Sequence, residues 1–361
     1  MNSKQSVLII GPFPKPISGV SLANKVVKGI LKDSKTFSVD IINTSYPNFE
    51  EKIGSFSLKK LFFNLKINLK VGKVFNNNIL YMTPGQTFFG ILKYAFFILI
   101  GSLFKKELII HVHGNHLGNQ YSILKGIKKK IFFYLLSQFN KGIVLSESLK
   151  SNLIPFLPEK KIYVLYNFAE DFLFEENVVV DPSILKIVYL SNLMEEKGIL
   201  YLLDALANLE LHNITYEAKI AGNIDENLKE KIHQKLNKLN NTTYLGVVKG
   251  KAKKELLEWS NIFILPTFYK MEGQPISIIE ALATGNAIIT TTHAGIPDII
   301  NNNENGFFIE EKNAKSIFNI LKYLSNNLIQ LEIIAHINKK HFTDNFTIDK
   351  FGSELKNIIN A

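Results

Sequence analysis

Short apolar runs alternate with longer helical patterns along the whole chain. In the first half the runs cover residues 7–11, 39–43, 79–82, 108–113, 142–146 and 162–165, and in the second half 186–191, 216–222, 243–246, 261–266 and 286–290. Continuous apolar runs of this length are typical of strands that are buried on both faces of a parallel sheet. Because the strands alternate with helices, the pattern predicts right-handed crossovers and one parallel sheet in each half.

The chain length and one break in the pattern predict two domains. With 361 residues the chain is too long for one typical core. Apolar periodicity fails across residues 167–176, before the strand that starts at Lys186. We therefore predict an α/β fold with two Rossmann-like, doubly wound domains, residues 1–168 and 169–340. In such sheets ligands bind beyond the carboxyl ends of the strands.

One segment, residues 261–285, places carboxylates at the end of a predicted strand. A loop carrying Glu272 follows the strand, Pro275 suits the first turn of a helix, and Gly285 suits the end of that helix. Inside this apolar helix, Glu280 lies on the only polar stripe. Burying its carboxylate without a partner would cost several kcal/mol, so a hydroxyl-rich ligand is a suitable match. Taken alone, two glutamates with the spacing of Glu272 and Glu280 are more often a solvated pair than a site.

The surrounding residues carry a resemblance to a known family. The spacing Glu272-x7-Glu280, the Glu-Gly-Gln-Pro start and the following residues 285–298 resemble the retaining glycosyltransferases usually called family 4. The resemblance implies two facing Rossmann-like domains, with Glu272 beside the donor sugar and Glu280 accepting hydrogen bonds from the nucleotide ribose. It also places four neighbours in the donor site: Gly273, Gln274, Pro275 and Ile276.

The resemblance extends into the predicted first domain. Residues 11–20 are similar to the family's first glycine-rich loop, with Gly19 present and Ser18 where a second glycine is common. A proline-rich turn between strand and helix also explains this segment. Residues 109–114 resemble the strand end that carries the family's active-site histidine, which aligns with His113. The resemblance also implies that residues 341–361 form a C-terminal helix that crosses back to the first domain.

His113 has two histidine neighbours, His111 on the same strand face and His116 in the loop. Three histidines so close in sequence raise the question of a metal cluster, but no carboxylate stands beside them. We therefore expect no metal site here.

In the predicted second domain, residues 187–199 are similar to the family segment in which an arginine and a lysine hold the donor diphosphate. Lys197 fits the lysine, and Asn192 occupies the arginine position. We therefore expect one ammonium, loop amides and the helix dipole after Pro275 to hold the phosphates. Gly222 and Val247 follow two other strands and are candidates for framing the base, although tight strand-to-helix turns explain both equally well.

Charge is distributed unevenly along the chain, and all 42 basic residues are lysine. Residues 1–170 hold 23 Lys against 8 acidic residues, a balance of +15, whereas residues 171–361 hold 19 against 24, a balance of −5. A basic half argues for an anionic partner. The absence of arginine weakens the nucleic-acid option, because arginine is the preferred reader of guanine, and so favours an anionic membrane surface.

Three segments suit a membrane surface. Two of them mix Lys with Phe and Leu, residues 58–70 and 124–136, and the third is an apolar stretch bounded by lysines, residues 94–104. The longest apolar stretch covers about half of the ~20 residues that a spanning helix needs. These segments are compatible with interfacial helices and equally with ordinary amphipathic helices. No signal peptide is visible and the chain has no cysteine. We expect a cytoplasmic protein, peripheral on the inner face of the cell membrane.

The expected reaction moves a hexose-like sugar from a nucleoside diphosphate sugar, UDP- or GDP-linked, to a lipid-linked or saccharide acceptor in bacterial surface polysaccharide synthesis. Retention of configuration is implied by the resemblance, as are the catalytic roles of His113, Glu272 and Lys197. The chain contains no Asp-x-Asp, so we expect no metal and no other cofactor. Two alternatives stay open: glycoside hydrolysis by Glu272 and Glu280, and a non-catalytic sugar-nucleotide or lipid-binding subunit.

Overall fold

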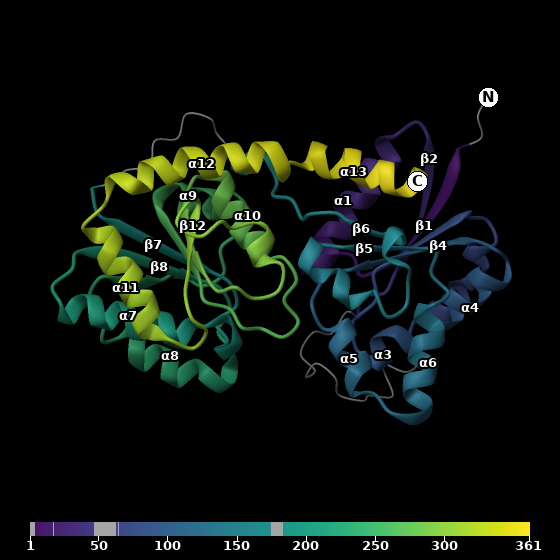
Figure 1. Cartoon of the computed structure of the whole chain (residues 1–361), viewed down its shortest axis with the longest axis horizontal. Helices are drawn as coiled ribbons and strands as arrows, with labels where there is room; N and C mark the ends of the chain where they lie inside the picture. Colours follow the sequence, from purple (N-terminus) through teal and green to yellow (C-terminus); the bar gives the residue numbers. More distant parts are fainter. Residues whose placement is uncertain (1–3, 17, 47–62, 64, 175–182) are drawn as a thin grey trace. The chain divides into compact units, whose positions relative to one another are not determined.

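The computed structural model describes residues 4–16, 18–46, 63, 65–174 and 183–361. Internal contacts divide the chain into two compact units, Met1–Tyr166 with Gly352–Ala361, and Asn167–Phe351. Each unit contains one six-stranded sheet in which all neighbouring strands pair in parallel. The predicted fold class, two Rossmann-like α/β domains, is confirmed (Figure 1).

The first sheet has the strand order β2-β1-β3-β4-β5-β6. Its strands are β1 (Gln5–Gly11), β2 (Phe37–Asn43), β3 (Ile79–Met82), β4 (Glu107–Val112), β5 (Lys141–Val144) and β6 (Ile162–Val164). The central strands are buried because helices cover both faces, which explains why β1 and β3 read as continuous apolar runs. In register, Ile9 of β1 lies opposite Ile41 of β2 and Tyr81 of β3.

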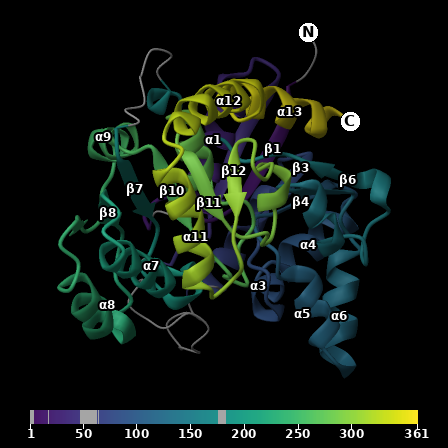
Figure 2. The ribbon, with the colours of Figure 1, turned by 60° about the vertical axis from the view of Figure 1, so that its left-hand side comes forward.

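Helices α3, α5 and α6 lie on one side of this sheet, and α1 and α13 lie on the other (Figures 1 and 2). The α-helices are α1 (Gly19–Asp33), α3 (Phe88–Leu92), α4 (Ala95–Leu103), α5 (Leu117–Ile123), α6 (Gly126–Leu136) and α13 (Ile348–Asn360). The 3-10 helices are η1 (Leu69–Val74), η2 (Glu147–Asn152) and η3 (Glu159–Lys161). Residues 58–62 and 64 of the predicted amphipathic segment 58–70 lie outside the described residues.

Ser18 has a structural role at the position where the family commonly has glycine. It is the N-cap of α1, in extended backbone conformation, and its side chain accepts a hydrogen bond from the Ser21 amide while Ser21 Oγ accepts one from the Ser18 amide. This reciprocal pair is a capping box, so Ser18 satisfies amide groups that a glycine would leave to solvent or a ligand.

The C-terminal residues are anchored in the first unit. Lys141 Nζ donates hydrogen bonds of 3.1 Å to the carbonyl oxygens of Ile358 and Ile359, at the end of α13, and pairs with Glu107 at 2.6 Å. A cation at a helix C-terminus satisfies free carbonyl groups there. The boundary between the units falls inside α13, so residues 341–351, which the resemblance assigned to the first domain, belong to the second unit.

The second sheet has the strand order β12-β11-β10-β7-β8-β9. Its strands are β7 (Leu185–Leu190), β8 (Tyr216–Ala221), β9 (Thr242–Tyr244), β10 (Ile262–Leu265), β11 (Ala287–Thr290) and β12 (Gly306–Phe308). The edge strand β12 was not expected from the sequence, because three residues after an asparagine-rich turn carry too little of a strand pattern.

Helices cover both sides of the second sheet as well, with α9, α10 and α12 on one side and α7, α8 and α11 on the other (Figure 2). The α-helices are α7 (Ile199–Leu211), α8 (Lys229–Leu236), α9 (Lys251–Trp259), α10 (Ile276–Ala283), α11 (Ala314–Ser325) and α12 (Ile329–Asn345). The 3-10 helices are η4 (Asp171–Leu173), η5 (Glu195–Lys197), η6 (Glu226–Leu228) and η7 (Ile296–Asp298). Among the described residues, no helix combines the length and the apolarity that crossing a membrane requires.

Gly222, at the end of β8, is required by the backbone. Its φ is +146°, and a Cβ at this position would lie 1.8 Å from the carbonyl oxygen of Ser191. Its amide donates to Gly246 O at 2.8 Å, which joins the ends of β8 and β9. The space beside Gly222 is therefore occupied by the backbone of Ser191, at the end of the adjacent strand β7.

We predict that Gly222→Ala destabilises the protein by about 1–3 kcal/mol, because the added methyl group must displace backbone at a φ that disfavours L-residues. Gly29→Ala is the matched control: Gly29 lies inside α1 with no atom within 4 Å of the added Cβ. That change should stabilise by roughly 0.5–1 kcal/mol. Thermal unfolding followed by circular dichroism measures both, and equal melting temperatures for the two variants would contradict the assignment.

Candidate functional site

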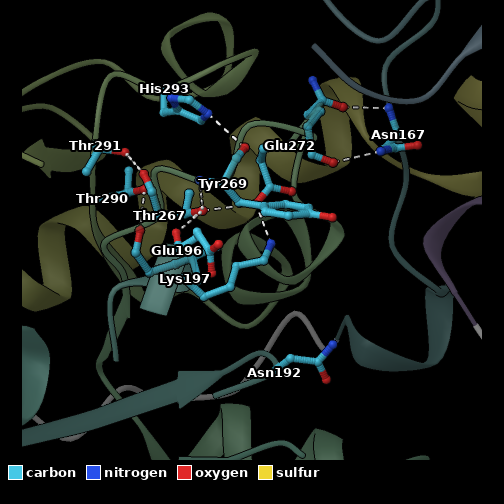
Figure 3. A network of polar contacts seen from close by, with 12 residues as sticks. Asn167, Asn192, Glu196, Lys197, Thr267, Tyr269, Glu272, Thr290, Thr291 and His293 are labelled. Atoms are coloured by element: carbon cyan, nitrogen blue, oxygen red, sulfur yellow. Dashed lines mark hydrogen bonds and ion pairs between the residues drawn. The ribbon is translucent and has the colours of Figure 1, made fainter. Parts of the chain in front are cut away.

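Polar side chains gather beyond the carboxyl ends of neighbouring strands in the second unit. The loops after β7, β10 and β11 carry Lys197, Glu272 and His293, respectively, and Figure 3 shows these side chains with their contacts. Because the three strands are adjacent in the sheet, their ends meet at one edge. This is the position at which doubly wound sheets bind ligands.

Lys197 and Glu272 form a mostly buried ion pair, with Lys197 Nζ on Glu272 Oε2 and side chains 13% and 10% exposed. The cause is a close approach of two loops. Gly198 follows Lys197 with φ +79°, and its Cβ position lies 2.2 Å from Pro266 O, so η5 packs directly on the end of β10. The Phe268 amide also donates to Glu196 O at 2.8 Å. The structure thus brings together two of the predicted catalytic residues.

Two further side chains surround this pair. The Thr267 hydroxyl lies 3.2 Å from Glu272 Oε2, and the ring centroid of Tyr269 lies 5.2 Å from Lys197 Nζ. The ammonium group therefore sits between a carboxylate and an aromatic face, both of which stabilise a cation. Such a lysine can exchange its carboxylate partner for an anionic ligand with a small side-chain movement.

The loop between Glu272 and α10 is fixed by hydrogen bonds. The Asn167 amide donates to Gln274 Oε1 at 2.6 Å, and Asn167 Nδ2 donates to Gln274 O at 2.8 Å. Gly295 N donates to Gly273 O at 2.9 Å, which joins this loop to the one after β11. Pro275 is the N-cap of α10 and Ile276 its first residue. The predicted donor-site residues Gly273, Gln274, Pro275 and Ile276 thus form one ordered segment.

Glu280 lies on α10 and is 5% exposed. Its partner within the chain is Lys253 of α9, whose Nζ lies 2.5 Å from Glu280 Oε1. Burial raises the pKa of Glu280, while the charge and hydrogen bond of Lys253 act in the opposite direction. The sequence indicated that this carboxylate needs a partner, and the structure supplies one from a residue that we did not predict.

Three predicted donor-site residues do not contact the Lys197–Glu272 pair in the part of the chain that the structure describes. Asn192 is exposed, and Figure 3 shows its side chain apart from the pair. Val247 is exposed in the loop after β9, and Gly222 is held by backbone contacts at the end of β8. Their proposed roles in binding phosphate and base remain predictions.

The remaining predicted residues belong to the first unit. Gly19 is exposed at the start of α1, and His113 follows β4. The rings of His113 and His111 lie 3.9 Å apart between centroids, and Tyr81 Oη lies 2.5 Å from His111 Nδ1. Burial lowers the pKa of His113 to about 4 and that of His111 well below its ordinary value. Both imidazoles are therefore neutral at pH 7.

Nε2 of His113 is buried and accepts or donates no hydrogen bond within the part of the chain that the structure describes. A neutral imidazole with a free nitrogen is suited to exchanging a hydrogen bond with a ligand. Over the same residues, no group of three or more His, Asp and Glu side chains is placed to hold a metal ion.

Comparison with known proteins gives a match in the second unit. Residues 174–341 match the family model described as glycosyl transferases group 1. The chain is 27% identical to an uncharacterized glycosyltransferase of Methanocaldococcus jannaschii over 60% of this chain and 58% of that one. It is also 27% identical to the capsular polysaccharide biosynthesis glycosyltransferase CapM of Staphylococcus aureus, over 61% of each. The chain thus spans about three fifths of the length of these two relatives.

The fold is shared with solved structures, one of which is described as a glycosyltransferase of Rickettsia africae, with a TM-score of 0.74 at 19% identity over 98% of this chain and 97% of that one. Anabaena Alr3699/HepE, crystallised with UDP, matches with a TM-score of 0.75 at 14% identity, over 99% of this chain and 100% of that one. At this identity the likeness shows the fold alone, two Rossmann-like domains of the type called GT-B.

Sequence reasoning missed Thr267, Tyr269 and Lys253. Thr267 and Tyr269 follow Pro266 at the end of a predicted strand, so their position beyond a strand end was an available signal. Lys253 carried no such signal, because a lysine in the first turn of a polar helix is usually solvated. Its contact with Glu280 depends on how α9 and α10 pack.

We predict that His113 makes the protein sensitive to acid. Its folded pKa, about 4, is lower than the unfolded value of about 6.5. The unfolded chain therefore binds more protons between these values, and stability is complete above pH 6.5 and declines as pH falls toward 4. Replacing His113 by Gln removes its contribution to this loss of stability, which is about 2 kcal/mol of the free energy of unfolding at pH 5. Melting temperatures at pH 7.5 and 5.0 test this: the decrease should be smaller in His113→Gln than in wild type, and equal decreases would contradict it.

Proposed function

We propose that the chain is a retaining glycosyltransferase that transfers a sugar from a nucleoside diphosphate sugar to a lipid-linked acceptor in bacterial surface polysaccharide synthesis. The observation that carries the proposal is the buried Lys197–Glu272 pair beyond the strand ends of the unit that matches the group 1 glycosyl transferase model. UDP is the first nucleotide to test, because a protein with the same fold was crystallised with it. The polysaccharide context is supported by the similarity to CapM, which is named for capsule synthesis.

The chemistry requires positive charge where the diphosphate leaves. As the glycosidic bond breaks, negative charge develops on the departing phosphate, and a preorganised cation stabilises it. Lys197 is suited to this role because its ammonium group needs to move only from Glu272 to the phosphate. Glu272, released from the ion pair, then accepts hydrogen bonds from sugar hydroxyls. Asn192, which carries no charge, contributes less than an arginine would.

His113 and Glu280 are assigned to the two substrates. Glu280 accepts a ribose hydroxyl, and the neutral His113 exchanges a hydrogen bond with the sugar or acceptor through Nε2. No Asp-x-Asp occurs in the chain, and Lys197, loop amides and the α10 N-terminus supply the positive potential. We therefore propose that the reaction is independent of metal ions.

Replacing Lys197 by Ala should lower the transfer rate about 10²–10³-fold, because one charged donor to the transition state is lost. The assay mixes the purified chain with UDP- and GDP-sugars and polyprenyl-diphosphate-linked sugar acceptors, and measures product by mass spectrometry and free nucleotide. The wild-type rate should be unchanged by excess EDTA. Abolition by EDTA with rescue by Mg²⁺ would overturn metal independence.

Lys235→Ala is the matched control, because Lys235 also forms an ion pair in the second unit, with Asp204 on α7. It should leave transfer unchanged. A parallel loss of activity and melting temperature in Lys197→Ala would instead indicate a structural lysine. Nucleotide binding without nucleotide release from any donor would favour a non-catalytic subunit, and cleavage of glycosides without nucleotide would favour a hydrolase.

Helices α3–α6 of the first unit present a surface suited to an anionic membrane, which is why we propose a peripheral location and a lipid-linked acceptor. The helices pack on one another through α6. On α4 the exposed Phe96, Leu99 and Leu103 are spaced three and four apart and form one stripe. We define the basic-apolar surface as these three residues together with Phe89, Ile123, Lys125, Ile127, Lys128, Lys129, Lys130, Phe133 and Tyr134.

Apolar side chains next to lysines match the two layers of a lipid interface, the acyl boundary and the anionic headgroups. Each lysine near such a bilayer contributes about 1 kcal/mol, so several give reversible attachment.

Replacing Lys128, Lys129 and Lys130 by Gln should weaken binding to acidic vesicles, because about 1 kcal/mol is lost per lysine. Vesicle binding is measured by sedimentation with phosphatidylcholine vesicles, with or without phosphatidylglycerol. The measurement is made at low salt and at about 1 M salt, where the Debye length is about 3 Å. Binding should require the acidic lipid and decrease with salt. The control replaces three exposed lysines of the second unit, Lys229, Lys231 and Lys238, by Gln. Absence of sedimentation with acidic vesicles at low salt, or equal losses in both triple variants, would remove this proposal.

A further inference from the structure

Glu280 belongs to a chain of three charged side chains from three separate elements of the second unit. Lys253, in the first turn of α9, lies 2.5 Å from Glu280 Oε1 and 4.0 Å from Glu170 Oε2. Glu170 immediately precedes η4, and Glu280 lies on α10. The Lys253 side chain is only 15% exposed. One ammonium group therefore stands between two carboxylates, of which Glu280 is the more deeply buried.

The contact constrains the Glu280 carboxylate in two ways. A buried carboxylate without a partner takes up a proton instead of staying charged, so the ammonium group favours the ionised form. The hydrogen bond to Oε1 also fixes the rotation of the carboxylate about its χ angles. Oε2 accepts no hydrogen bond from the described part of the chain, so this oxygen is the one presented to a ligand.

We propose that Lys253 is a positioning residue for nucleotide recognition: it keeps the Glu280 carboxylate ionised and oriented so that Oε2 accepts a hydrogen bond from a ribose hydroxyl of the donor. This inference rests on the proposed function, which assigns Glu280 to the ribose. Lys253 acts through Glu280 and makes no contact with the nucleotide itself. An ionised acceptor forms a stronger hydrogen bond with a hydroxyl group than a neutral one does.

The charged groups that act on Glu280 are Lys253 and Glu170. Burial raises the pKa of Glu280, Lys253 opposes that rise through its charge and its hydrogen bond, and the Glu170 charge adds to it. Without Lys253 the rise is unopposed, so Glu280 takes up a proton at a higher pH. Nucleotide affinity then becomes pH-dependent, and it decreases as pH falls.

The experiment is calorimetric titration of the full chain with UDP at pH 8 and pH 6. Lys253→Met should weaken UDP binding about tenfold at pH 8, the effect of losing one well-oriented charged hydrogen bond. The loss should be larger at pH 6, whereas Lys253→Arg should retain most of the wild-type affinity. Lys251→Met is the matched control, because Lys251 lies two residues away on the same helix and is 89% exposed. It should bind UDP as wild type does.

A double-mutant cycle separates positioning from direct contact. If Lys253 acts through Glu280, adding Lys253→Met to Glu280→Gln causes no further loss of UDP affinity. If the two losses multiply, Lys253 contacts the nucleotide itself and the inference is wrong. If Glu280→Gln weakens UDP binding but Lys253→Met does not, the inference fails while the ribose role of Glu280 stands. If Glu280→Gln leaves the affinity unchanged, the ribose role in the proposed function fails.

Glu170→Gln tests the same inference without breaking the buried Lys253–Glu280 pair. This variant is used if Lys253→Met does not fold. Without the Glu170 carboxylate, Lys253 pairs with Glu280 alone, and one negative charge near Glu280 is removed. UDP affinity at pH 6 should therefore equal or exceed that of wild type, with a smaller difference between pH 6 and pH 8. A larger pH dependence in Glu170→Gln than in wild type would overturn the inference.

Discussion

Burial of parallel strands on both faces is the constraint that shapes this protein. Strands such as β7 and β10 have no exposed face, so polar side chains can gather only where the strands end. Since β10 pairs with β7 on one side and β11 on the other, the loops after these three strands meet at one edge of the sheet. Lys197 and Glu272 are neighbours for this reason, although 75 residues separate them.

Buried charge is compensated inside the second unit by lysine. Lys197 pairs with Glu272 and Lys253 pairs with Glu280, so each mostly buried carboxylate of the candidate site has its own ammonium group. Lysine holds a carboxylate as a point charge, without the two-pronged geometry of arginine. An ammonium group is therefore free to change partners by rotation, as the proposed binding and release of a diphosphate would require.

The first unit distributes its charge in the opposite way. Around the end of β4, His111 and Tyr81 are buried and His113 is half-buried with its Nε2 inside, and both imidazoles stay neutral because burial disfavours their charged forms. Lysines such as Lys128 and Lys130 of α6 lie instead on exposed positions, beside exposed aromatic and aliphatic side chains, whereas Lys141 is mostly buried against Glu107. Neutral imidazoles inside and lysines beside apolar side chains outside are consistent with the proposed contact of this unit with a sugar acceptor and a lipid surface.

The sequence by itself determined the two parallel sheets, because continuous apolar runs between helical patterns allow few other arrangements. It also indicated Glu272, Glu280 and Lys197, since their spacing and neighbours resemble those of a known family. The tertiary structure alone decided which charges pair. Lys253 reaches Glu280 only because α9 packs beside α10, and Gly222 is required because Ser191 O occupies the space of a side chain. These contacts join residues far apart in sequence, and local periodicity contains no information about which distant side chains will share one buried space.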